Sequence, residues 1–129
     1  MCLSIKVNHP ELVLADSEHV GYQFIVVHNR LGYRCGYVRV PQGHPWHGMD
    51  YDEIDADVHG GLTFAELDVP CGKGDDNAYW VGFDCGHYMD APDPAFGVEN
   101  RYPSDGIVRT QEYVEAECRN LCEQAQKVA

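Results

Sequence analysis

The sequence predicts an α+β fold, in which a small and mainly antiparallel β-sheet packs against one C-terminal α-helix. Two observations predict this class. Short β-branched and aromatic segments separated by turn residues recur up to residue 85, and a long amphipathic segment ends the chain. The 129 residues are 44% hydrophobic and contain no linker rich in Pro, Gly or Ser, so we expect a single domain over residues 1–129.

The first two strands are predicted to form a β-hairpin. Residues 22–28 and 33–40 are both rich in β-branched and aromatic side chains, and residues 29–32 between them offer turn chemistry. Residues 42–48 contain too many Pro and Gly residues for a strand or helix and are predicted to be a loop. We expect the acidic segment that follows, residues 50–57, to be irregular.

Two further strands are predicted in the middle of the chain. In the first, residues 58–64, Gly60 and Gly61 indicate a bulge or a close approach of the backbone to another group. A loop rich in Gly and Asp is expected over residues 70–78. Residues 79–85 are apolar at most positions of both faces, which predicts a central strand.

The C-terminal part is predicted to contain one long helix. Residues 88–105 include three prolines and should form an irregular connection. Thr110 is the expected N-cap, and Glu112 lies in the first turn, where a negative charge is favourable. Apolar residues then recur at helical spacing and should pack across the sheet: Val114, Cys118, Leu121, Cys122 and Ala125.

The chain is strongly acidic, with a formal net charge of −12 and a pI of about 4.7. This balance argues against direct nucleic-acid binding, which needs a basic surface. It favours a protein partner with a basic surface, although ordinary solubility charge is the simpler explanation. The residues predicted to contact the partner are the carboxylates of the acidic segment: Asp50, Asp52, Glu53, Asp55 and Asp57.

The sequence also bears on the cellular compartment. Its longest uninterrupted aliphatic and aromatic run, residues 24–27, is far too short to span a membrane. The N-terminus lacks the pattern of a secretory signal. We therefore expect a cytoplasmic protein without membrane association, whose six cysteines are reduced.

Several residues have the chemistry of zinc ligands. Zinc is bound by imidazole nitrogen, thiolate sulfur and carboxylate oxygen, usually four in number. His59 belongs to the strand predicted at 58–64, and the other candidates lie at the end of the strand predicted at 79–85. These two strand ends would be neighbours in the sheet. The predicted Zn²⁺ ligands are His59, Asp84, His87 and Asp90.

Alternatives to this ligand set remain open. Cys85 either replaces Asp84 as a ligand or fills the core, because adjacent strand residues face opposite sides. His44 lies in a loop that could approach the same site. Without a metal, His59 and His87 would be hydrogen-bonded scaffold residues. An EF-hand beginning at Asp50 is excluded, since its glycine and its bidentate glutamate are absent.

Nucleophilic catalysis is poorly supported. The three serines, Ser4, Ser17 and Ser104, do not occur in a Gly-x-Ser-x-Gly motif. Metal-assisted hydrolysis is better supported than nucleophilic catalysis as an enzymatic hypothesis, with Asp90 or Glu66 as general base beside the zinc ion. We therefore expect a protein without enzymatic activity and keep a metal-dependent hydrolase as the alternative.

Four ordered blocks resemble a family of small, largely uncharacterised phage and prophage accessory proteins. The blocks are residues 36–45, 57–64, 79–87 and 109–118. Family members often read Phe-Asp-Cys-Ala-His-Ala-Gly-Asp in the third block and the residues after it. This chain keeps the polar residues of that motif but has Gly86, Tyr88 and Met89 at its variable places. The departures at Tyr88 and Met89 leave the local loop shape open.

The resemblance implies a function, because some family members are associated with anti-CRISPR activity against Cas9. We therefore expect a small acidic metal-binding protein in the cytoplasm of the host cell. It would inhibit a host defence nuclease, Cas9 or a related type II effector, by occupying its basic nucleic-acid channel. The alternatives are the metal-dependent hydrolase and a phage accessory protein with a purely structural zinc ion.

Overall fold

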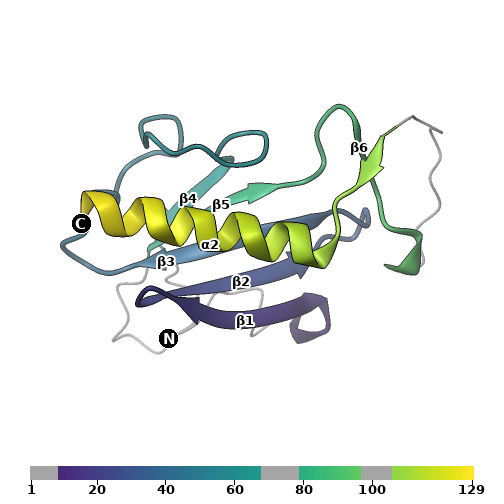
Figure 1. Cartoon of the computed structure of the whole chain (residues 1–129), viewed down its shortest axis with the longest axis horizontal. Coiled ribbons are helices and arrows are strands. Elements are labelled where there is room, and N and C mark those ends of the chain that lie inside the picture. Colours follow the sequence, from purple (N-terminus) through teal and green to yellow (C-terminus); the bar gives the residue numbers. More distant parts are fainter. Residues whose placement is uncertain (1–8, 68–78, 97–105) are drawn as a thin grey trace.

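The computed structural model describes residues 9–67, 79–96 and 106–129, and it confirms the α+β class. Within these residues a five-stranded antiparallel sheet has the strand order β1-β2-β3-β5-β4. One long helix, α2, lies across one face of the sheet (Figure 1). The main elements are β1 (Val13–His19), β2 (Tyr22–His28), β3 (Arg34–Val40), β4 (Phe64–Leu67), β5 (Tyr79–Asp84) and α2 (Gln111–Val128).

Short elements complete the described part of the chain. A 3₁₀ turn, η1 (Pro10–Leu12), precedes β1, and another, η3 (Pro94–Phe96), follows β5. Strands β6 (Asp90–Ala91) and β7 (Ile107–Val108) form a small parallel pair next to the start of α2. Among the described residues, no helix has the length and apolar character needed to cross a membrane.

The predicted hairpin is confirmed. Strand β2 has the predicted bounds and β3 begins one residue later than predicted. In the turn between them, the Asn29 side-chain oxygen accepts hydrogen bonds from the backbone N–H groups of Leu31 and Tyr33. Gly32 has a φ of +88°, which a residue without a Cβ adopts at little cost. The strand predicted at 79–85 is also confirmed as β5, inside the sheet between β3 and β4.

The strand predicted over residues 58–64 is wrong except for its last residue. Gly60 and Gly61 have φ values of +68° and +79°, so the backbone turns there, and β4 begins only at Phe64. The predicted close approach of the backbone is nevertheless present. A Cβ on Gly60 would lie 2.4 Å from His87 Nε2, a separation that real Cβ atoms do not show. Strand β1, at the edge of the sheet, was not predicted.

The connections agree with the sequence where the structure describes them. Residues 42–48 are a succession of turns, and residues 50–57 form no regular element. The predicted loop at 70–78 lies outside the described residues. So does the end of the predicted irregular connection, residues 97–105, whereas its first part contains β6 and η3.

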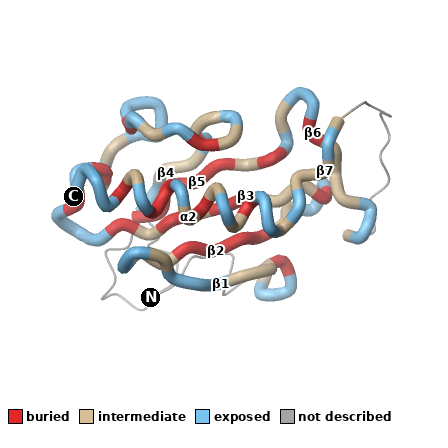
Figure 2. Tube along the Cα trace, in the orientation of Figure 1, coloured by how far each residue is buried: buried red, intermediate tan, exposed pale blue. Residues whose placement is uncertain are grey.

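The core lies between the sheet and the apolar stripe of α2. All five stripe residues are fully buried, and they belong to one cluster with residues such as Phe24, Val38 and Phe83. Buried segments follow the central strands, while the outward side of α2 is exposed (Figure 2). The predicted N-cap is confirmed, since the Thr110 hydroxyl accepts a hydrogen bond from the backbone N–H of Tyr113.

The close packing of α2 depends on Gly36 in β3, which has no side chain at the helix–sheet contact. A Cβ there would lie 2.5 Å from Cys118 Sγ and 2.7 Å from the Phe83 ring. Gly36→Ala should therefore lower the free energy of unfolding by about 1–3 kcal/mol through overpacking, measured by urea denaturation. Ser17→Thr, which adds a methyl group at an exposed position of β1, should change it by less than about 0.5 kcal/mol. Equal stability of wild type and Gly36→Ala would contradict this account of the packing.

Candidate functional site

The candidate site lies where the turn after the acidic segment meets the end of β5 and the start of α2. The turn supplies His59, and the end of β5 with the residues after it supplies Asp84 and His87. Asp90 belongs to the short strand β6. The remaining site residues come from the segment that enters α2 and from its first turns: Arg109, Tyr113 and Glu117.

Asp90 is the centre of this arrangement. Its side chain is 1% exposed and accepts three hydrogen bonds. The donors are Arg109 Nε at 2.8 Å, His59 Nε2 at 2.8 Å and the backbone N–H of His87 at 3.0 Å. Burial alone would raise the pKa of Asp90, but these three hydrogen bonds outweigh it and lower the pKa below its ordinary value. The carboxylate is therefore ionised and compensated inside the protein.

The hydrogen bonds of His59 define where its proton lies. The ionised Asp90 can only accept, so Nε2 of His59 carries the hydrogen. In the neutral ring Nδ1 is then the acceptor, and it lies 2.8 Å from the Tyr113 hydroxyl oxygen. The backbone N–H of His59 donates to Glu117 Oε1 at 2.9 Å. Both ring nitrogens of His59 are thus engaged within the protein.

Asp84 and His87 form a second and more exposed pair. His87 Nε2 lies 3.4 Å from Asp84 Oδ1, and their side chains are 34% and 32% exposed. The Asp84 carboxylate also accepts hydrogen bonds from the Thr63 hydroxyl at 2.9 Å and from the backbone N–H of Gly86 at 3.0 Å. The His87 Nε2 atom itself is buried and makes no hydrogen bond, because its contact with Asp84 lacks the required direction.

The structure thus brings the four predicted zinc ligands into one region, with the rings of His59 and His87 6.0 Å apart between centroids. It does not place the ligand atoms of all four residues around one point. Among the described residues, Asp50, Asp52 and Glu53 form the one group of three or more His, Cys, Asp or Glu residues whose ligand atoms all lie within 4.8 Å of one another. Zinc binding by His59, Asp84, His87 and Asp90 therefore stays a prediction.

Cys85 and His44, the alternative ligands, are both buried. Cys85 is 2% exposed and belongs to the core cluster. Burial, and then the charge of Asp90, raise the pKa of its thiol to about 12, so it is not a thiolate at neutral pH. The buried His44 ring lies 2.9 Å from the backbone oxygen of Ala125 through Nε2, and its Nδ1 accepts the Trp46 backbone N–H at 3.0 Å. His44 thereby ties its loop to the end of α2.

The acidic segment is exposed but firmly attached. All five of its predicted partner-binding carboxylates are exposed, whereas Ile54 within it and Val58 after it are buried. Gln124 of α2 accepts from the backbone N–H of Asp57 and donates to its carbonyl oxygen, each at 2.8 Å. Asn120 donates to the same carbonyl at 3.1 Å. The segment is therefore held by the helix through uncharged groups.

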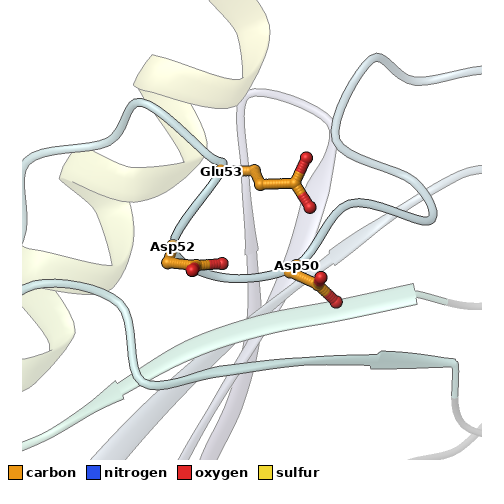
Figure 3. Close-up of side chains that lie close together, drawn as sticks. All are labelled: Asp50, Asp52 and Glu53. Atoms are coloured by element: carbon orange, nitrogen blue, oxygen red, sulfur yellow. The ribbon is translucent and has the colours of Figure 1, made fainter.

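Three of these carboxylates crowd together on one turn of the acidic segment. Figure 3 shows the side chains of Asp50, Asp52 and Glu53 close together on one stretch of loop. Oxygen ligands of this kind suit a hard divalent cation. Exposed carboxylates are also common without one, so this grouping by itself assigns no metal.

Arg109, Tyr113 and Glu117 were not predicted as site residues. Tyr113 and Glu117 are four residues apart, which places them on one side of α2, away from the apolar stripe, while Arg109 lies just before the N-cap. That spacing was the available signal, but nothing in the sequence indicated that the partner of this face would be His59. Comparisons with protein-family models, with curated proteins and with solved structures gave no match to this chain.

The ionised Asp90 should contribute to stability in a pH-dependent way. Because its pKa is lowered in the folded protein, the contribution is fully present above the ordinary carboxyl pKa of 3.8 and is lost as the pH falls through the folded-state pKa. Asp90→Asn should lower the free energy of unfolding by about 3 kcal/mol at pH 7, since it leaves Arg109 without its buried counter-charge.

This prediction is checked by denaturant unfolding of both proteins between pH 7 and pH 2. The difference between wild type and Asp90→Asn should shrink below pH 3.8. Asp52→Asn, at an exposed position, is the matched control and should change stability by less than about 0.5 kcal/mol. A difference that does not vary with pH would show that the Asp90 charge does not stabilise the fold.

Proposed function

We propose that this protein is a non-enzymatic inhibitor that binds a host defence nuclease through its acidic segment. The nuclease would be Cas9 or a related type II effector, and the acidic segment would occupy its basic nucleic-acid channel. The observation that carries the proposal is the fixed array of five exposed carboxylates at residues 50–57. No Lys or Arg occurs between Arg39 and Lys73, so the sequence places no formal positive charge within or beside this array.

The attachment of the acidic segment supports a binding role. A flexible acidic run would lose conformational freedom when it bound a partner, and this loss would weaken the complex. Here the hydrogen bonds of Gln124 and Asn120 hold the segment, and the burial of Ile54 anchors it. The carboxylates are therefore already arranged before binding, as a surface that competes with the phosphates of a nucleic acid.

The charge of the whole protein supports the same role. A net charge of −12 attracts a basic surface over several ångströms and raises the association rate, an effect that salt weakens. The identity of the nuclease rests on the resemblance to phage accessory proteins alone. The proposal therefore divides into a general part, binding to a basic protein surface, and a specific part, inhibition of Cas9.

The specific part is tested by DNA cleavage with guide-loaded Cas9 and by direct binding to it. The wild-type protein should slow cleavage, and the triple variant Asp52→Asn, Asp55→Asn, Asp57→Asn should bind about tenfold more weakly. A loss of about 0.5 kcal/mol for each charge gives this factor. The affinity of the wild type should also fall more steeply with salt than that of the variant.

The control for this experiment removes the same charge elsewhere. Glu11, Glu18 and Glu112 are exposed outside the acidic segment, and their replacement by Gln changes the net charge equally. This control should keep most of the wild-type affinity. Absence of any effect of the wild type on Cas9 binding and cleavage would refute the specific proposal, and equal losses in both triple variants would refute the role of the acidic segment.

The Asp52, Asp55, Asp57 triple variant should also be more stable than the wild type at low salt. Repulsion between the crowded carboxylates opposes folding, and the hydrogen bonds to Asp57 that hold the segment involve only its backbone. Thermal unfolding should show a higher midpoint for the variant in dilute buffer, and the difference should vanish near 1 M salt. A lower midpoint would mean that these carboxylates stabilise the fold instead of serving recognition.

A further inference from the structure

One buried polar atom of the candidate site has no hydrogen-bonding partner. His87 Nε2 is covered by protein, and a Cβ on Gly60 would lie 2.4 Å from it. The groups around it otherwise satisfy one another, since His59, Asp90, Arg109 and Tyr113 are all engaged. A buried polar group without a partner in a native fold generally indicates a water molecule or an ion.

The group that faces His87 Nε2 is a carboxylate oxygen at the spacing of two zinc ligands. Asp84 Oδ1 lies 3.4 Å away, without hydrogen-bond direction. Two ligand atoms about 2.0–2.1 Å from one tetrahedral Zn²⁺ lie about 3.3–3.4 Å from each other. The observed separation is therefore the one that a shared ion would produce.

From this geometry we propose that Asp84 and His87 bind a divalent transition-metal ion such as Zn²⁺, with water in the remaining coordination positions. The inference goes beyond the proposed inhibitor function and does not depend on it. It also narrows the predicted set of four ligands to two. His59 and Asp90 act as a hydrogen-bonded support beside the ion.

The surroundings of Asp84 and His87 fit this role. Ligating carboxylates are usually fixed by hydrogen bonds from outside the coordination shell. The Thr63 hydroxyl and the Gly86 N–H fix Asp84 in this way, while the His87 backbone is fixed by its N–H bond to Asp90. Both ligand side chains are about one-third exposed, but Nε2 itself is covered, so the groups next to Nε2 must move aside to admit an ion and its waters.

The chemistry of the pair also selects the ion. One imidazole nitrogen and one carboxylate oxygen suit Zn²⁺ and its transition-metal neighbours, whereas Ca²⁺ and Mg²⁺ prefer oxygen ligands alone. The all-oxygen group Asp50, Asp52 and Glu53 is therefore a competitor for a different class of ion. With two protein ligands, the Asp84–His87 site should bind and release its ion more readily than a closed four-ligand site.

The test is a titration of the full-length, reduced protein with Zn²⁺, followed through the imidazole ¹⁵N resonances of its seven histidines. The Nε2 resonance of His87 should shift and saturate at one equivalent. His87→Gln and Asp84→Asn should each weaken zinc binding at least tenfold while circular dichroism confirms that they are folded. The Asp52, Asp55, Asp57 triple variant should bind zinc as the wild type does.

The protein offers a matched control of the same residue types. His19 Nε2 lies 3.1 Å from Glu123 Oε2 in hydrogen-bond contact, and the His19 side chain is about as exposed as that of His87. The His87 resonance should respond at lower zinc concentrations than that of His19. A His87 resonance that does not respond to zinc, or an Asp84→Asn variant with wild-type zinc affinity, would overturn the proposal and leave a bound water as the partner of Nε2. Neither result bears on nuclease inhibition, which is measured separately.

Discussion

The buried carboxylate of Asp90 is the interaction on which the arrangement of this protein's polar residues depends. A charge in the interior is tolerated only when it is paired and hydrogen-bonded, and here the donors come from three separate stretches of chain. His59 follows the acidic segment, His87 follows β5, and Arg109 precedes α2. Because each donor must reach the same two oxygens, the three stretches are fixed relative to one another, and so are the residues next to them.

Helix α2 extends this constraint to the rest of the molecule. Its N-terminal end meets the candidate site through Tyr113 and Glu117, and its C-terminal half holds the acidic segment through Asn120 and Gln124. Farther along, the carbonyl of Ala125 lies within hydrogen-bond distance of His44, which fastens the loop after β3. The apolar stripe between these contacts positions the helix on the sheet, with Gly36 allowing the close approach. Packing thus determines where the polar groups lie.

The sequence predicted those features that depend on neighbouring residues. The hairpin of β2 and β3, the N-cap at Thr110 and the buried stripe of α2 all follow from local pattern or turn chemistry. The strand predicted at 58–64 failed because alternation was given more weight than the two glycines, whose positive φ values break the extended backbone. Strand β1 was missed because four of its seven residues are polar, as suits an edge strand in which no residue is fully buried.

The sequence predicted where the candidate site lies but not which hydrogen bonds its residues make. The residue types predicted that four side chains lie in one region, and the structure does bring them together: His59, Asp84, His87 and Asp90. Whether an imidazole nitrogen meets a metal or a hydrogen-bond partner depends on groups far away in the sequence. Tyr113 lies 54 residues from His59, and Arg109 lies 19 residues from Asp90. No local spacing indicates such pairs. The sequence therefore could not distinguish the residues that hydrogen-bond to one another from the residues that we propose to bind a metal ion.

In the proposed function, the fold and the recognition of the partner depend on different physical interactions. The acidic segment is held by amide, backbone and apolar contacts, which salt hardly affects, while its carboxylates point their charge at solvent. Carboxylates that stabilised the fold through ion pairs would be neutralised by neighbouring cations. Their long-range attraction for a basic partner would then be weaker. An acidic surface meant for a basic partner therefore needs an uncharged means of attachment. The pairing of Asp57 with Gln124 and Asn120 has this property, and it is why the accumulation of negative charge is compatible with an ordered segment.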